Sequence, residues 1–174
     1  MIRITGGTKR GRVGRPAPIL VMVCWMLGCS SSVGPTEPGA AETTSEIEYQ
    51  LFQMSNRERN IAGVVEDLVL DSALSDIARR YSEEMRDRGF FSHSSPDGTT
   101  LRERLERAGV EYSRAGENIA QVTNASNPAV LAHDLLMDSE RHRANILDRR
   151  FQQVGICVAR SSDTLWITQV FVTP

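Results

Sequence analysis

The sequence predicts an α+β fold, with helices packed on a small, mostly antiparallel sheet. Two observations support this prediction. Apolar residues recur at helical spacing in several segments after residue 45, whereas the C-terminal tail carries short β-branched runs with a polar turn between them. The chain has 174 residues, which leaves enough length for one domain with its own core once an export segment is set aside.

Residues 1–28 have the layout of a secretory signal. Five cationic residues come first, and a mostly apolar, uncharged run follows from Ala17 to Gly28. This run is too short for a stable membrane-spanning helix, which needs ~20 apolar residues. We therefore expect an exported, extracytoplasmic protein whose leader is removed.

The leader ends at Met26-Leu27-Gly28-Cys29, which resembles the cleavage site of a bacterial lipoprotein. A lipid on Cys29 would anchor the domain to a membrane of the cell envelope. Ser30 after the cysteine favours the outer membrane, if the organism has one. Leu27 departs from the usual pattern, because a smaller residue is common there. The alternative is an ordinary signal peptide, cut at another small residue, which releases a secreted protein.

Residues 29–45 are predicted to be a flexible tether, and residues 46–174 the folded domain. The tether is rich in Ser, Pro, Gly, Thr, Ala and Glu, so few large apolar side chains offset the entropy of ordering it. Without the leader, 15 of the 20 basic residues and all 22 acidic residues remain, a formal charge of −7. This balance argues against a nucleic-acid partner, which is bound through cationic side chains.

Capping patterns place the predicted helices. Ser45 and Glu48 form a capping-box pattern before a first helix that ends near Asn60. Asp71 is the predicted cap of a second helix, which carries an apolar stripe and ends at Gly89.

Two further helices follow by the same reasoning. Thr100 and Glu103 form another capping-box pattern, which predicts a third helix that stops at Gly109. Asn127 followed by Pro128 predicts the start of a fourth helix, because proline is well tolerated at the first helical position.

The tail predicts two strands, at residues 154–158 and 165–171, with a polar turn between them. Cys157 alternates with apolar residues in the first of these strands. A free cysteine in this setting is more often a small buried residue than a nucleophile. Because Cys24 lies in the leader and Cys29 is the proposed lipid site, the sequence offers no structural disulfide.

Three short polar clusters, far apart in the sequence, contain residue types that suit a single site. They are Phe90-Phe91-Ser92-His93, Gly116-Glu117-Asn118-Ile119-Ala120 and Ser139–Leu147, which contains His142. In residue identity and in order along the chain they resemble the motifs of the CAP superfamily, which includes cysteine-rich secretory proteins, antigen 5 and plant pathogenesis-related proteins. The resemblance is closest to the disulfide-free bacterial branch and runs from about Glu46 to the C-terminus. It implies a three-layer α-β-α sandwich with a strand near residues 118–122.

The resemblance implies that His93, Glu117 and His142 line one cavity. Two neutral imidazoles and a carboxylate can hold Zn²⁺ with one open position. No compact ligand spacing such as HExxH supports a metal, so this part of the prediction depends on the resemblance. The alternative is a structural role for each of these residues, as we expect for Arg143 and Asn145.

The family pattern includes a second glutamate, in a Trp-Tyr-x-Glu segment ahead of the second histidine. Here the matching stretch is Leu136-Met137-Asp138-Ser139, so Ser139 stands at the glutamate position. Glu140 is the candidate substitute for the cavity, although one residue turns a helical side chain by about 100°.

Three functions are compatible with the sequence. The preferred one is a ligand-binding module of the cell envelope whose cavity, with or without a metal, holds a lipid or a cell-wall component. The second is a metal-assisted, protease-like hydrolase in which a histidine or Glu117 activates water. Its only serine candidates, Ser92 and Ser139, lie in no recognisable nucleophile turn. The third is a structural or interaction domain without a working site.

Overall fold

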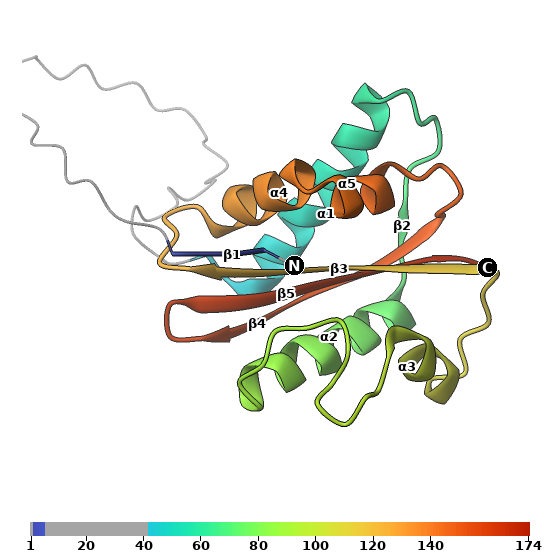
Figure 1. The fold of residues 1–174 in the computed structure, drawn as a ribbon. Helices are drawn as coiled ribbons and strands as arrows, with labels where there is room; N and C mark the ends of the chain where they lie inside the picture. The colour runs from blue at the N-terminus through green and yellow to red at the C-terminus, as the bar shows by residue number, and fades with distance from the viewer. Residues whose placement is uncertain (1, 6–41) are drawn as a thin grey trace, which may run out of the picture. The chain divides into compact units, whose positions relative to one another are not determined.

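The sheet lies between two layers of helices (Figure 1). The structure is a computed structural model and describes residues 2–5 and 42–174. Helices α1, α4 and α5 cover one face of the sheet, and α2 and α3 cover the other. The helices span Thr44–Ile61 (α1), Ser72–Asp87 (α2), Leu101–Arg107 (α3), Pro128–Asp138 (α4) and Glu140–Leu147 (α5). This arrangement confirms the α+β class and the three-layer α-β-α sandwich.

The sheet of the described residues has five strands, in the order β1-β3-β5-β4-β2. The central pairs β3–β5 and β5–β4 are antiparallel, and β1 and β2 add parallel strands at the two edges. The strands span Ile2–Thr5 (β1), Val69–Leu70 (β2), Arg114–Thr123 (β3), Gln153–Ser161 (β4) and Thr164–Thr173 (β5). Both edge strands are additions to the predicted sheet, and β1 falls inside the predicted leader.

Helix α1 begins earlier than the sequence suggested. Its N-cap is Thr43, and the capping box joins Thr43 to Glu46 rather than Ser45 to Glu48. Both pairs have the spacing of a capping box, so the pattern alone does not choose between them. Glu48, which takes no part in the capping box, has a different partner. Its Oε1 accepts a hydrogen bond from the Val158 N–H at 2.9 Å, on the outer edge of β4.

The other predicted caps are confirmed. Asp71 accepts a hydrogen bond from the Leu74 N–H at the start of α2. Thr100 and Glu103 form the capping box of α3. Asn127 caps α4, with Pro128 as its first residue.

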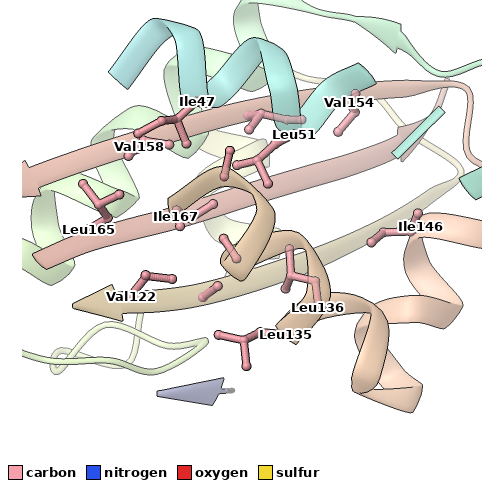
Figure 2. Packing of buried hydrophobic residues seen from close by; sticks show 14 of the residues in the cluster. Ile47, Leu51, Val122, Leu135, Leu136, Ile146, Val154, Val158, Leu165 and Ile167 are labelled. Atoms are coloured by element: carbon pink, nitrogen blue, oxygen red, sulfur yellow. The ribbon is translucent and has the colours of Figure 1, made fainter. Parts of the chain in front are cut away.

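Two apolar cores fill the spaces between the layers. The first core lies between the sheet and helices α1, α4 and α5. In it, Ile47 and Leu51 of α1 and Leu136 of α4 pack against Val158 and Ile167 of the sheet (Figure 2). The second core joins α2 and α3 to the opposite face of the same strands. The alternation of side chains along β5 therefore serves both cores.

Helix α2 packs unusually close to β4 at Gly155. A Cβ atom at this position would lie 2.1 Å from the Leu74 carbonyl carbon and 2.3 Å from the Ser75 nitrogen. These are backbone atoms, so no side-chain movement relieves the clash. Glycine at 155 therefore fixes the distance between α2 and the sheet, and with it the position of the loop that follows α2.

A fully buried arginine joins the end of α1 to the C-terminal half of the fold. Arg59 is 0% exposed, and its guanidinium donates to the carbonyls of Glu66, Ile146, Asp148 and Phe151. Burial lowers the pKa of Arg59, and nearby carboxylates oppose that shift. The backbone carbonyls accept hydrogen bonds from the guanidinium N–H groups, as a buried charged group usually requires.

Several sequence-based predictions fall on residues outside the described part. They are the leader beyond residue 5, the lipid site Cys29 and most of the tether. None of the described helices is long and apolar enough to cross a membrane.

Candidate functional site

Glu117 is the centre of the candidate site. Its side chain, on β3, is only 4% exposed, yet both carboxylate oxygens have partners. Oε1 lies 2.8 Å from His93 Nδ1, and Oε2 accepts a hydrogen bond from Arg104 Nη2. Residues from three separate segments therefore meet at one buried carboxylate, and two of them belong to the predicted cavity set.

The loop after α2 presents His93. Gly89 adopts a φ of 65°, which allows the chain to turn out of the helix. Tyr81 then donates a hydrogen bond to the Ser92 carbonyl, and Ser95 donates one to Glu84. Burial raises the pKa of Tyr81 to about 12, so its hydroxyl remains a donor throughout the neutral range. Helix α2 thus holds the loop on both sides of the histidine.

Arg104, on α3, is a site residue that the sequence analysis missed. Its side chain is 10% exposed, and its guanidinium carbon lies 3.4 Å from the centre of the Tyr81 ring. A signal was present, because Arg104 falls between Leu101 and Ala108 on the apolar stripe of its helix. A basic residue on such a stripe needs a buried partner, and here that partner is Glu117.

His142, on α5, completes the predicted set. It is 3% exposed, and its ring centre lies 6.2 Å from that of His93. Burial is the main cause that lowers the pKa of His142 from 6.5 to about 4. The His142 imidazole is therefore neutral at physiological pH. The His93 side chain differs in its exposure, because it lies at the mouth of the site in contact with solvent.

A network of amides fixes α5 against β3. Asn118 donates to the His142 carbonyl at 3.1 Å and to Gln169 Oε1 at 3.0 Å. Asn145 donates to the Glu117 carbonyl at 3.2 Å and to Asn118 Oδ1 at 2.9 Å. Each of these buried polar groups has a partner, so the network makes the cavity wall rigid. The scaffolding role predicted for Asn145 fits this geometry.

Arg143 also serves the scaffold. Its Nη1 donates to the Met137 carbonyl at 2.8 Å, near the end of α4. This bond lies between α4 and α5, where the chain turns through Ser139. Arg143 is not among the residues that line the cavity beside Glu117.

The cavity has a volume of about 770 Å³ and lies along β3, between α5 and the His93 loop. All three predicted residues line it. Ser139 and Arg141 line it as well, but Glu140 does not and is exposed to solvent. Glu140 therefore does not replace the missing family glutamate in this geometry, which agrees with the turn of about 100° between neighbouring helical residues. The lining residues are His93, Ser94, Thr100, Leu101, Arg102, Ala115, Gly116, Glu117, Ser139, Arg141, His142, Ala144 and Asn145.

The residues present fit a zinc ion poorly. Within the described ranges, no three His, Cys, Asp or Glu side chains are grouped so as to hold a metal. Both oxygens of Glu117 are already engaged, and the positive charge of Arg104 beside them opposes a second cation. The cavity chemistry supported by this geometry is hydrogen bonding and charge recognition by the side chains themselves.

Cys157 and Ser92, two of the residues that carry a nucleophilic group, are poorly placed for covalent chemistry. Cys157 is 1% exposed, and burial raises its pKa to about 12, so its thiol is not a reactive thiolate. This fits the apolar role predicted from the sequence. The Ser92 hydroxyl accepts a hydrogen bond from the Ser94 N–H at 3.3 Å and so participates in a local turn.

The comparison with known families agrees with this geometry. Residues 52–171 match the CAP family, described as the cysteine-rich secretory protein family. The chain belongs to the CAP family. The matched range includes the His93 loop, the Glu117 strand and the His142 helix of this CAP domain.

Bacterial CAP relatives extend the comparison. YkwD of Bacillus subtilis is 34% identical over 137 residues, which are 79% of this chain and 51% of YkwD. This CAP chain thus spans about half the length of that relative. An extracellular protein containing an SCP domain, from Bacillus anthracis, has a TM-score of 0.64 and 31% identity, over 81% of this chain and 45% of its own. An outer surface protein of Borrelia burgdorferi shares the fold, with a TM-score of 0.66 and 16% identity, over 76% of this chain and 96% of its own.

Proposed function

We propose that this CAP protein is a binding module of the cell envelope, and that its cavity holds a lipid or a cell-wall fragment through Glu117, His93 and His142. The bacterial relatives include an extracellular protein, which supports a location outside the cytoplasm. A lipid on Cys29 would keep the module at the membrane surface.

One observation carries the proposal. Glu117 is a buried carboxylate at the wall of an open cavity, with one oxygen held by His93 and the other by Arg104. Burying a charge is costly, and a core built for stability alone is served as well by apolar residues. A rigid polar group beside about 770 Å³ of accessible space is the arrangement expected of a preorganised ligand site.

The test is ligand-observed NMR on the full chain with two probes. One probe is a mixture of muropeptides released from purified cell wall by a muramidase, and the other is monomeric dihexanoylphosphatidylglycerol. We expect saturation transfer to at least one probe. Glu117→Gln should abolish the transfer, because it removes the charge at the cavity wall while keeping the shape of the side chain.

The matched control is Glu140→Gln, which makes the same chemical change at an exposed position outside the cavity. This variant should bind like the parent. Equal transfer in the parent and in Glu117→Gln, or no transfer to either probe, would contradict binding at this cavity. Thermal unfolding of each variant shows whether a lost signal reflects a lost fold.

A further inference from the structure

A second pocket, of about 290 Å³, lies between α2, α3 and the loop at residues 95–99. It shares no lining residue with the cavity around Glu117. Its wall combines three arginines with apolar groups. The residues that matter here are Arg80, Arg104, Arg107, Ile77, Tyr81 and Ala108.

The charges of this pocket favour an anion. Two carboxylates also line it, but both accept hydrogen bonds from other groups. Glu84 accepts from Arg88 and Ser95, and Asp97 accepts from the Thr99 N–H. The side chain of Arg80, by contrast, is exposed to solvent and makes no hydrogen bond or ion pair within the part of the chain that the structure describes. The pocket therefore holds an arginine whose charge no carboxylate neutralises directly.

Arg104, which lines this pocket, is incompletely hydrogen-bonded. Its Nη2 donates to Glu117, but its Nη1 reaches the Thr99 carbonyl only at 3.5 Å. Its Nε is buried and has no hydrogen-bond partner among the described residues. The Arg104 guanidinium thus has unused hydrogen-bonding capacity, and a ligand oxygen that reaches its weakly bonded Nη1 would be favourable.

We propose that this pocket binds a small organic carboxylate. Guanidinium groups recognise the planar carboxylate through paired hydrogen bonds. Ile77, Tyr81 and Ala108 supply an apolar wall for a short carbon chain. The local excess of positive charge is small, because Glu84 and Asp97 remain nearby, and this suits a monoanion better than a doubly charged phosphate.

Occupancy of the pocket is linked to the cavity through Arg104. The same guanidinium that borders the pocket also holds Glu117, which in turn contacts His93. A carboxylate beside Arg104 competes with Glu117 for its charge and hydrogen bonds. Coupling of this kind is reciprocal. A cavity ligand that weakens the contact between Glu117 and Arg104 must therefore change the affinity of the pocket for its carboxylate.

The experiment is a titration of the ¹⁵N-labelled full chain, followed by amide and imidazole NMR signals. The probes are butyrate, N-acetylalanine and inorganic phosphate, each tested alone. We expect saturable shifts with a carboxylate, centred on residues 77–84 and 104–108, together with a shift of the His93 imidazole. Tighter binding of butyrate points to a free carboxylic acid as the natural ligand, and tighter binding of N-acetylalanine points to a peptide C-terminus.

Two variants decide the location. Arg80→Gln combined with Arg107→Gln should weaken carboxylate binding at least tenfold, whereas Arg79→Gln, on the same helix but outside this pocket, should leave it unchanged. Unchanged affinity in the double variant would overturn the site. Phosphate binding more tightly than both carboxylates would overturn the assignment of a carboxylate ligand. Carboxylate binding without a His93 shift would overturn the coupling between the pocket and the cavity around Glu117. None of these readouts uses a cavity ligand, so they are independent of the proposed function.

Discussion

The burial of His142 makes the stability of the fold depend on pH. Its pKa is lowered, mainly by burial, from 6.5 to about 4 in the folded protein. The unfolded chain therefore takes up a proton near pH 6.5, while the folded chain resists protonation until about pH 4. The stabilising contribution is complete above the unfolded pKa and decreases as the pH falls through this window.

We predict that the free energy of unfolding decreases by roughly 1–2 kcal/mol from this residue between pH 7.5 and pH 5.0. Urea unfolding of the parent and of His142→Gln at both pH values measures the effect. The variant should lose less stability on acidification than the parent. His133, whose pKa is also lowered by burial, acts in the same direction and remains in both proteins. Equal losses would show that His142 is not the group responsible.

Arg104 sets the charge that a ligand of the cavity meets. Because its guanidinium neutralises Glu117, we predict that Arg104→Met raises the affinity for Zn²⁺ at least tenfold. The measurement is calorimetric titration with Zn²⁺, with Ca²⁺ and Mg²⁺ as controls, after replacement of all three cysteines by serine.

Two histidine substitutions show where the metal binds. His93→Ala with His142→Ala, added to Arg104→Met, should abolish the gained affinity, with the fold checked by circular dichroism. A zinc affinity that does not respond to Arg104→Met would mean that Arg104 does not control the charge at Glu117. Retention of the gain without the histidines would place the metal elsewhere.

At the scale of elements, Arg59 joins several segments that are far apart in the sequence. It ties the end of α1 to the end of α5 and to the loop before β4, through backbone carbonyls alone. We predict that Arg59→Met lowers the free energy of unfolding by ~3–5 kcal/mol, because buried carbonyls lose a charged donor. Urea unfolding provides the measurement. Arg57→Met, at an exposed position on the same helix, should change stability by less than about 0.5 kcal/mol, and a similar loss in both variants would contradict the prediction.

The helices were predictable because their ends carry local chemical signals. Asp71, Thr100 and Asn127 each cap the helix expected from the sequence. The start of α1 was misplaced because two overlapping residue pairs have capping-box spacing, and only the tertiary contact of Glu48 with Val158 distinguishes them. Strand β2 has two residues, too few for any alternation to be visible.

The site was predictable only in part. The family resemblance identified His93, Glu117 and His142, and the fold places all three on one cavity. Arg104 was missed because no local pattern shows which carboxylate a basic residue on an apolar stripe will meet. Glu140 was a reasonable substitute by sequence position, but the helix turns its side chain to solvent.

At the scale of the whole molecule, the remaining question is attachment to the membrane. We predict that the protein is found in the membrane fraction of cells and that Cys29→Ser moves it to the soluble extracytoplasmic fraction, because the lipid attachment site is lost. Cell fractionation followed by immunoblotting measures this. The control is Cys157→Ser, which removes a buried thiol and should leave the protein in the membrane fraction. A Cys29→Ser protein that stays fully membrane-bound would rule out the anchor.

The hydrogen bond between Glu48 and Val158 has a consequence for aggregation between copies of the protein. Strand β2 covers β4 only at Gln153 and Val154, so the outer edge of β4 further along is the place where a strand from another copy would add. Glu48 occupies the Val158 N–H that such a strand would need, and the Arg160 guanidinium turns back to the Glu42 carbonyl. Copies of this domain that collide along this edge therefore do not find the free Val158 donor that a shared sheet would need, which opposes fibre-like aggregation.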